Sequence, residues 1–178
     1  MTFHHYDFPA KFRALYDKAV KGYAGGLRDV ETFFDAEELR WLAANGIPAQ
    51  ALYDYAEDQL GAGEPGYDQA LAIELVRRDY FLNAQRGVAS QTVADPDGWP
   101  AKTAAVEGIE WLPRILPKAR AKLRGELPAS LMYGCGGDRR FFKAHDILPA
   151  EFLALVWRHE RDDAAVIAWV VARSRAKR

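Results

Sequence analysis

Helix start and stop signals recur along almost the whole chain, and they constrain its fold more than any other feature. Asp35 is followed three residues later by Glu38, which is the spacing of a capping box. The helix that Asp35 opens would end at Asn45-Gly46, where glycine can adopt a left-handed conformation, and Pro48 suits the first position of the next helix. Strand signals are nearly absent, because no hairpin signal and no set of alternating segments occurs. The pattern predicts an all-α protein.

The size of the chain fits one compact helical domain. It has 178 residues, of which 49% are hydrophobic and 28% charged. We expect an orthogonal bundle of about seven or eight helices. The longest segment, Asp68–Gly87, carries apolar residues on more than one face and should lie centrally, with Asp68 as its N-cap. We also expect a helix over Pro9–Val20, a helix capped by Asp138, and one short strand at Leu131–Tyr133.

Two stretches about one hundred residues apart resemble each other. Residues 40–52 can be laid against residues 140–153 with one residue inserted. In both, a short aromatic helix meets an isoleucine, and Pro-Ala then opens a second helix that a third one follows. The likeness predicts two related three-helix units around the long central helix. The alternative is coincidence, since helix–proline–helix junctions are common.

The formal net charge of −1 conceals two opposite halves. Residues 1–100 hold 9 basic and 16 acidic residues, a net charge of −7, whereas residues 101–178 hold 15 basic and 9 acidic residues, a net charge of +6. The change falls next to a stretch where helical periodicity lapses and turn formers such as Asp95-Pro96 gather. The two halves could attract each other within one chain or in a head-to-tail homodimer.

These shifts in pattern suggest four segments. They are an N-terminal helix and lead-in (1–34), an acidic three-helix module (35–87), a linker (88–108) and a basic helical module (109–178). We expect the two modules to form one compact domain.

The residue inventory argues against several classes of protein. The single cysteine, Cys135, rules out an intramolecular disulfide, and the first residues lack the basic and apolar segments of a signal peptide. The longest apolar run, Ala164–Ala172, is about half of what a bilayer requires. No histidine has metal-site spacing and no phosphate-loop or dinucleotide pattern occurs, so neither a metal nor a cofactor is implied. The inventory predicts a cytoplasmic protein.

Three ordered blocks in the second half resemble a bacterial family. Gly108–Ala121 contains Gly-x-x-x-Leu-Pro-Arg and Lys-Ala-Arg-Ala, Tyr133–Phe142 contains Tyr-x-Cys followed by Asp-x-Arg, and Asp162–Val170 ends in Trp-Val. Together they resemble the family known as domain of unknown function 5069. Gly136-Gly137 stands where that family has Pro-Leu. The resemblance implies a small helical cytoplasmic protein without an assigned activity, and it transfers no catalytic residue.

Cys135 is the most distinctive chemical group of the second half. It lies in a glycine-rich turn before a predicted helix start, with arginines nearby, and both features favour a thiolate. A glycine-rich turn also lets backbone N–H groups approach an anion. The candidate ligand-binding residues are Arg114, Tyr133, Cys135, Asp138 and Arg140. The alternative is an inert cysteine in a turn that the glycines merely shape.

Two groups of basic residues have more than one interpretation. Arg77 and Arg78 interrupt the longest helix, where charges are usually paired, so we expect a network with acids such as Glu57 or Asp58. An anion-binding pocket is the alternative. The segment 114–124 holds five basic residues and no acid. An intramolecular match or a solvated face explains it better than nucleic acid does.

The sequence therefore favours a non-catalytic module that binds a protein partner or a small anionic ligand. The alternative is a thiol-dependent enzyme or redox sensor that uses Cys135, with His145 as a base. Convergence of the candidate residues on one concave pocket would favour ligand binding. Their dispersal would favour a structural or protein-interaction role.

Overall fold

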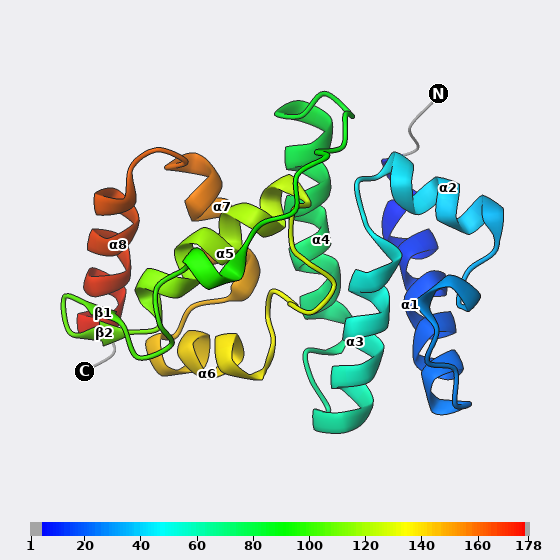
Figure 1. Ribbon diagram of the computed structural model, residues 1–178, viewed down its shortest axis with the longest axis horizontal. Coiled ribbons are helices and arrows are strands. Elements are labelled where there is room, and N and C mark those ends of the chain that lie inside the picture. The colour runs from blue at the N-terminus through cyan, green and yellow to red at the C-terminus, as the bar shows by residue number, and fades with distance from the viewer. Residues whose placement is uncertain (1–4, 177–178) are drawn as a thin grey trace.

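The structure is a computed structural model that describes residues 5–176, and within that range the chain is a helical bundle (Figure 1). The all-α prediction is confirmed. The eight helices are α1 (Phe8–Ala24), α2 (Ala36–Ala44), α3 (Ala49–Ala62), α4 (Gly66–Asn83), α5 (Leu112–Arg124), α6 (Gly136–His145), α7 (Pro149–Arg158) and α8 (Asp163–Ala176). Two 3-10 helices (Val30–Thr32 and Pro96–Gly98) and two short strands, β1 (Ala105–Val106) and β2 (Ile109–Glu110), complete it. Among these helices none is both long and apolar enough to cross a membrane.

The long helix α4 is central, as its apolar pattern predicts. Figure 1 shows α1–α3 on one side of it and α5–α8 on the other. The buried side chains form two hydrophobic clusters that meet along α4: one is built on α1–α3 and extends to Ala70, and the other extends from Ile73 into α5–α8. Helix α4 packs against α1 and α3 through one side and against α5 and α7 through another.

The two similar stretches form junctions with the same backbone geometry. In α2–α3 the N–H of Ile47 donates to the carbonyl of Leu42 at 3.0 Å, and in α6–α7 the N–H of Ile147 donates to Phe142 at 3.0 Å. The residue before each isoleucine is left-handed, with φ of 70° at Gly46 and 54° at Asp146. Both isoleucines are buried. The sequence likeness thus corresponds to a repeated turn that buries an isoleucine between two helices.

Several local predictions are wrong. Leu131–Tyr133 forms no strand; β1 and β2 instead pair as an antiparallel hairpin, with Val106 opposite Ile109. The turn residues Glu107 and Gly108 both have positive φ, which permits the tight connection. This turn was missed because glutamate does not usually occupy such a position.

Two expected N-caps are also wrong, whereas the third is correct. Pro65 holds the cap position of α4 and Cys135 that of α6, so Asp68 and Asp138 lie inside the first turns of these helices. Asp35 caps α2 in a full capping box with Glu38. An acidic residue near a helix start can therefore sit one turn further in, where it faces the core or the helix dipole.

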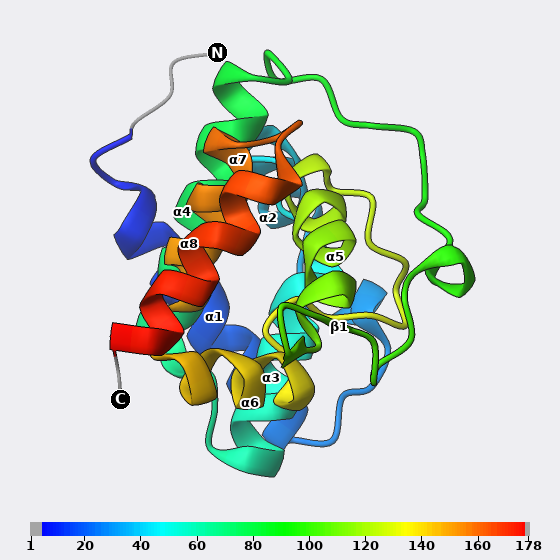
Figure 2. The ribbon, with the colours of Figure 1, turned by 90° about the vertical axis from the view of Figure 1, so that its left-hand side faces the viewer.

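The segment between α4 and α5 runs along the outside of the bundle (Figure 2). It is tied down at two points. The N–H of Ala94 donates to the carbonyl of Glu126 at 2.8 Å, and Arg114 Nη1 donates to the carbonyl of Pro100 at 2.8 Å. This path brings the Trp99–Glu110 part of the segment over α5 and α6.

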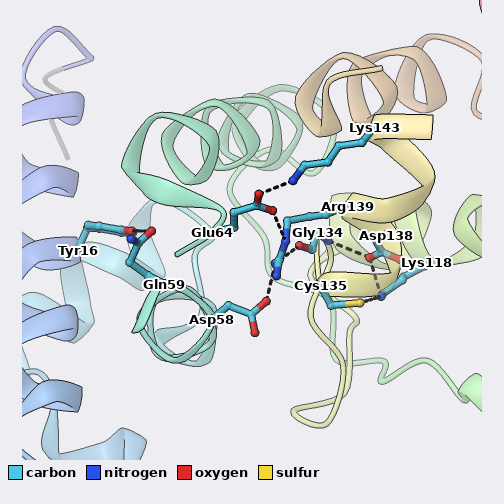
Figure 3. Close-up of polar contacts among 10 residues, drawn as sticks. All are labelled: Tyr16, Asp58, Gln59, Glu64, Lys118, Gly134, Cys135, Asp138, Arg139 and Lys143. Carbon is cyan, nitrogen blue, oxygen red and sulfur yellow. Dashed lines mark hydrogen bonds and ion pairs between the residues drawn. The ribbon is translucent and has the colours of Figure 1, made fainter. Parts of the chain in front are cut away.

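Ion pairs join basic residues of the second half of the chain to acidic residues of the first half. Arg139 contacts Asp58 at 2.5 Å and Glu64 at 3.0 Å, and Lys143 also pairs with Glu64 (Figure 3). Lys122 pairs with Glu74 in the interior. In each of these pairs the base comes from the second half and the acid from the first. The opposite charges of the halves therefore meet within one chain.

Candidate functional site

A cavity lined by most of the predicted site residues lies between the Trp99–Trp111 segment, α5 and α6, and we call it the Cys135 pocket. Its volume is about 740 Å³. Four of the five predicted ligand-binding residues line it, together with the predicted base: they are Arg114, Cys135, Asp138, Arg140 and His145. The structure thus brings together side chains that lie up to 31 positions apart in the sequence.

The helix start of α6 places the thiol at the edge of this pocket. Gly134 has a φ of 86° and turns the chain into α6, so that Cys135 takes the N-cap position. Its side chain is partly buried, and the ammonium group of Lys118 donates to Sγ at 3.3 Å. The group that donates a hydrogen bond to the thiol is therefore a lysine from α5.

Asp138 is fully buried, and its two oxygens accept three hydrogen bonds. Trp111 Nε1 donates to Oδ1 at 3.0 Å, while Lys118 Nζ and the N–H of Gly134 donate to Oδ2 at 2.7 and 2.9 Å. Figure 3 shows Lys118 between Asp138 and Cys135. A buried carboxylate with this many donors is a fixed structural charge. Asp138 therefore acts as the anchor of the site and holds both Lys118 and Trp111 in place.

Trp111 lies in a strained conformation that the site requires. It is the N-cap of α5 and has a φ of 71°, which is rare for a large side chain. Its indole ring covers Gly137, where a Cβ would lie only 2.6 Å from Cζ2. Gly137, which replaces the hydrophobic residue expected from the family pattern, thus makes room for the ring that bonds Asp138.

The accessible charge of the Cys135 pocket is positive. Four bases and two acids line it, and one of these acids, Asp138, already pairs with Lys118. Arg114 lies over the Trp99 ring at 5.7 Å, besides its bond to Pro100. Arg140 is exposed and makes no hydrogen bond or ion pair within residues 5–176. Arg140 is therefore the cation that is ready to meet a ligand.

His145 lines the same pocket but is held by α8. Its Nδ1 lies 2.8 Å from Ser174 Oγ, and that hydroxyl donates to the carbonyl of Val170 at 2.8 Å. The hydroxyl has a single proton, which it donates to Val170, so Nδ1 must be the donor in the first bond. Nε2 is then the ring nitrogen that is left to accept a proton. The hydrogen bond to the thiol comes from Lys118, and the role of His145 as the base for Cys135 stays a prediction.

Tyr133, the fifth predicted ligand-binding residue, does not line the Cys135 pocket. It is 1% exposed, and its hydroxyl donates to the carbonyl of Pro149 at 2.8 Å. Burial, reinforced by the negative charge of Asp138, raises the pKa of Tyr133 well above its usual value. Its position two residues from Cys135 puts it on the core side of the turn.

Sequence reasoning missed Lys118 and Trp111 as members of the site. Lys118 belongs to a run of basic residues that suggested a solvated face, yet it is only 5% exposed. Its spacing offered one signal: Lys118 and Lys122 lie one turn apart, on the side of the helix that also carries Ile115 and Ala119. The other bases of the run contact the protein as well, since Arg120 pairs with Asp163 and Arg124 lies 3.5 Å from Glu160.

The network expected for the two arginines of α4 is also wrong. Glu57 accepts a hydrogen bond from Tyr23, and Asp58 pairs with Arg139. Arg78 instead donates from Nε to Asn45 Oδ1 at 2.5 Å. In the other arginine, Arg77, Nε and Nη1 make no hydrogen bond to any residue in the range 5–176.

These features define a helical protein with a cationic pocket that contains one cysteine. The family model of the domain of unknown function DUF5069 matches residues 101–178, and the resemblance noted in the three sequence blocks is thereby confirmed. The match includes Trp111, Lys118, Cys135 and Asp138. No curated protein and no solved structure matches the chain. Among residues 5–176 no group of three or more histidine, cysteine, aspartate or glutamate side chains could hold a metal ion.

Proposed function

We propose that the protein binds a small anionic molecule in the Cys135 pocket. The observation that carries the proposal is the convergence of Arg114 and Arg140 on one cavity whose buried acid, Asp138, is already neutralised by Lys118. A volume of about 740 Å³ lies within the roughly 300–1,000 Å³ range of small-molecule sites. Trp99 and Trp111 supply flat apolar surface beside the cations, which suits an anion that also has a planar part.

Titration calorimetry with pyrophosphate and with a planar dicarboxylate such as terephthalate tests this proposal. We expect binding that Arg140→Ala weakens about tenfold or more, because one charge-assisted hydrogen bond contributes about 1.5–3 kcal/mol. Arg161→Ala is the matched control, since this exposed arginine lies in the turn before α8 and outside the pocket lining. Equal binding by the two variants would contradict the proposal.

A second candidate function is thiol chemistry at Cys135. It is favoured by the 3.3 Å contact between Lys118 Nζ and Sγ, because a neighbouring ammonium group stabilises a thiolate. With iodoacetamide the sulfur would form a C–S bond, iodide would leave, and the thiol proton would pass to solvent. We expect native Cys135 to be labelled near neutral pH, more slowly in Lys118→Met. Labelling only after denaturation would exclude this candidate.

The two candidates can be separated in one experiment. An anion bound in the Cys135 pocket should protect the thiol from iodoacetamide, with protection that saturates at the concentration measured by calorimetry. Protection without catalytic turnover of any electrophile supports a binding role. Rapid labelling with no anion binding supports the thiol role.

A further inference from the structure

A second cavity lies on the other side of the 125–133 segment, and we call it the Arg77 pocket. Its volume is about 260 Å³, and it is bounded by α3, α4 and the end of α5. Its walls combine a few polar side chains with an apolar surface from Ala51, Leu127, Pro128 and Met132. It is therefore a small pocket suited to a compact, mostly apolar molecule.

Arg77 lines this pocket as a buried charge without an ion pair among the described residues. It is 2% exposed, and both Nε and Nη1 are buried without a hydrogen-bond acceptor. Its guanidinium group instead lies 5.4 Å from the centroid of the Phe81 ring, a contact that leaves these N–H groups unsatisfied. A charge that is removed from water without a partner is costly, so such groups are rare unless a ligand or an unusual environment compensates them.

The nearest carboxylate does not compensate Arg77. Glu74, one turn earlier on α4, pairs with Lys122 and also accepts a hydrogen bond from Tyr55 at 2.7 Å. Of the two buried cations, Lys122 forms an ion pair with Glu74, whereas Arg77 has no ion pair among residues 5–176. Arg77 is therefore the cation on the wall of the cavity that a ligand can still pair with.

The Arg77 guanidinium packs directly against the backbone of Gly125. Gly125 ends α5 with a φ of 71°, and a Cβ at this position would lie 2.5 Å from Arg77 Nη2. Any other residue would therefore be strained and would also displace the guanidinium group. Gly125 and Arg77 both line the Arg77 pocket, so the lack of a side chain at Gly125 keeps this donor at the cavity wall.

The remaining polar wall limits the charge that the ligand can carry. Asp54 lies on the same wall, and its carboxyl group accepts a hydrogen bond from Gln50 at 2.7 Å. A dianion such as phosphate would meet this acid as well as the arginine. A single carboxylate on an apolar body matches one cation that has no ion pair, beside an apolar wall.

We infer that the Arg77 pocket binds a small organic monocarboxylate, with its carboxylate on the Arg77 guanidinium and its apolar body against Leu127, Pro128 and Met132. This site is separate from the Cys135 pocket and does not depend on the function proposed there. The two cavities share Leu131 in their linings, so the 125–133 segment forms the wall between them.

Calorimetric titration of the full chain with benzoate and with hexanoate tests the inference, with benzamide and inorganic phosphate as reference probes. We expect at least one carboxylate to bind and to raise the melting temperature. Benzamide and phosphate should each bind about tenfold more weakly or not at all, since they lack the single charge or the apolar body. Failure of both carboxylates to bind at millimolar concentration, or tighter binding of phosphate, overturns the inference.

Two arginine variants separate a ligand-binding role from a structural one. Arg77→Met should lose about tenfold or more in carboxylate affinity while the free protein keeps or gains stability, because an unpaired buried charge is removed. Arg78→Met is the matched control: this neighbour is also buried but is bonded to Asn45, so its loss should lower stability and leave carboxylate affinity within about twofold. The opposite pattern would contradict the inference.

A third variant keeps the test informative if a core arginine variant does not fold. Ala129 is exposed and lines the mouth of the Arg77 pocket, so Ala129→Trp should reduce carboxylate binding without disturbing the core. Pyrophosphate binding in the Cys135 pocket should be unchanged in Ala129→Trp. Unchanged carboxylate binding in this variant would place the ligand elsewhere.

Discussion

Lys118 and Lys122 lie one turn apart on α5, and both are buried beside a buried carboxylate, yet their surroundings differ. The carboxylate of Asp138 receives donors on both oxygens, including Trp111 and a backbone N–H. The carboxylate of Glu74 receives donors on one oxygen, and its Oε2 has no partner among the described residues. Two equally buried carboxylates therefore differ in how many of their oxygens accept hydrogen bonds. The saturated pair forms a fixed wall of the Cys135 pocket, whereas the unsaturated pair borders the Arg77 pocket.

The largest effect should come from removing one lysine of this pair. Lys118→Met leaves the Asp138 charge buried, and we expect a loss of about 3–5 kcal/mol in the free energy of unfolding. Lys122→Met should cost less, about 1–3 kcal/mol, because the unpartnered N–H groups of Arg77 can turn to Glu74 one turn away. Urea denaturation measures both. An equal loss of unfolding free energy in the two variants would show that the difference in hydrogen bonding does not affect stability.

Asp54 gives the second prediction, which concerns the Arg77 pocket alone. Burial raises the pKa of Asp54 to about 6, against the opposing effects of the Gln50 hydrogen bond and Lys122. The folded state therefore holds this proton between about pH 4 and pH 6 while the unfolded chain releases it. Through this group, stability is greatest below pH 4 and declines as the pH rises to 6.

Replacement of Asp54 by asparagine should remove that decline. We expect Asp54→Asn to be about 1–3 kcal/mol more stable than the wild type at pH 7 and nearly equal to it at pH 4. Urea denaturation at several pH values checks this expectation. A constant difference across the range would mean that the carboxyl group does not titrate there.

Gly125 and Gly137 allow a third comparison of the two pockets. Gly125→Ala should cost about 1–2 kcal/mol from the left-handed backbone alone, and it should also displace Arg77. Gly137→Ala involves no positive φ, so its cost should come from movement of the Trp111 ring. Tryptophan fluorescence should therefore change in Gly137→Ala and stay constant in Gly125→Ala. A similar spectrum in both would contradict the assignment of these contacts.

The smallest effect is expected at the surface between the halves. The Lys143 and Glu64 side chains are 67% and 37% exposed, so Lys143→Ala should cost only a few tenths of a kcal/mol, and less in high salt. Arg139→Ala should cost more, because its side chain is 11% exposed and also donates to the carbonyl of Gly134 at 2.8 Å. Thermal denaturation at two salt concentrations distinguishes the two variants.

The sequence revealed the helical class and much of the Cys135 pocket, for physical reasons that particular residues illustrate. Asp35 caps a helix that begins at the next residue, and Gly46 supplies the positive φ that follows the end of that helix. Both roles depend only on neighbouring residues, so the local sequence is sufficient to find them. Cys135 stood out because its chemistry is unusual beside glycines, whereas Arg114 and Arg140 belong to the motifs that carry the family resemblance. Residues 88–108 were correctly expected to lack helical structure, apart from the short 3-10 turn at Pro96–Gly98.

What the sequence did not reveal depends on contacts between distant elements. Whether Lys118 faces solvent or the core is decided by α6, and the partner of Arg78 lies 33 positions away at Asn45. The isolation of Arg77 could not be predicted, because it follows from the pairing of Glu74 with Lys122 across 48 positions. Which buried polar groups have partners can therefore be determined only once the fold is known.

The course of α4 sets the boundaries of any fragment that can fold. The hydrophobic cluster that encloses α5–α8 also contains Ile73 and Tyr80, and the buried Lys122 finds its acid on the same helix. The family match begins at residue 101 and so omits α4 entirely. A fragment cut at that position would expose the apolar faces of α5 and α7 and would leave Lys122 without a counter-ion. We expect a cooperative unit only in fragments that begin at or before Gly66, which makes α4 a shared part of both halves.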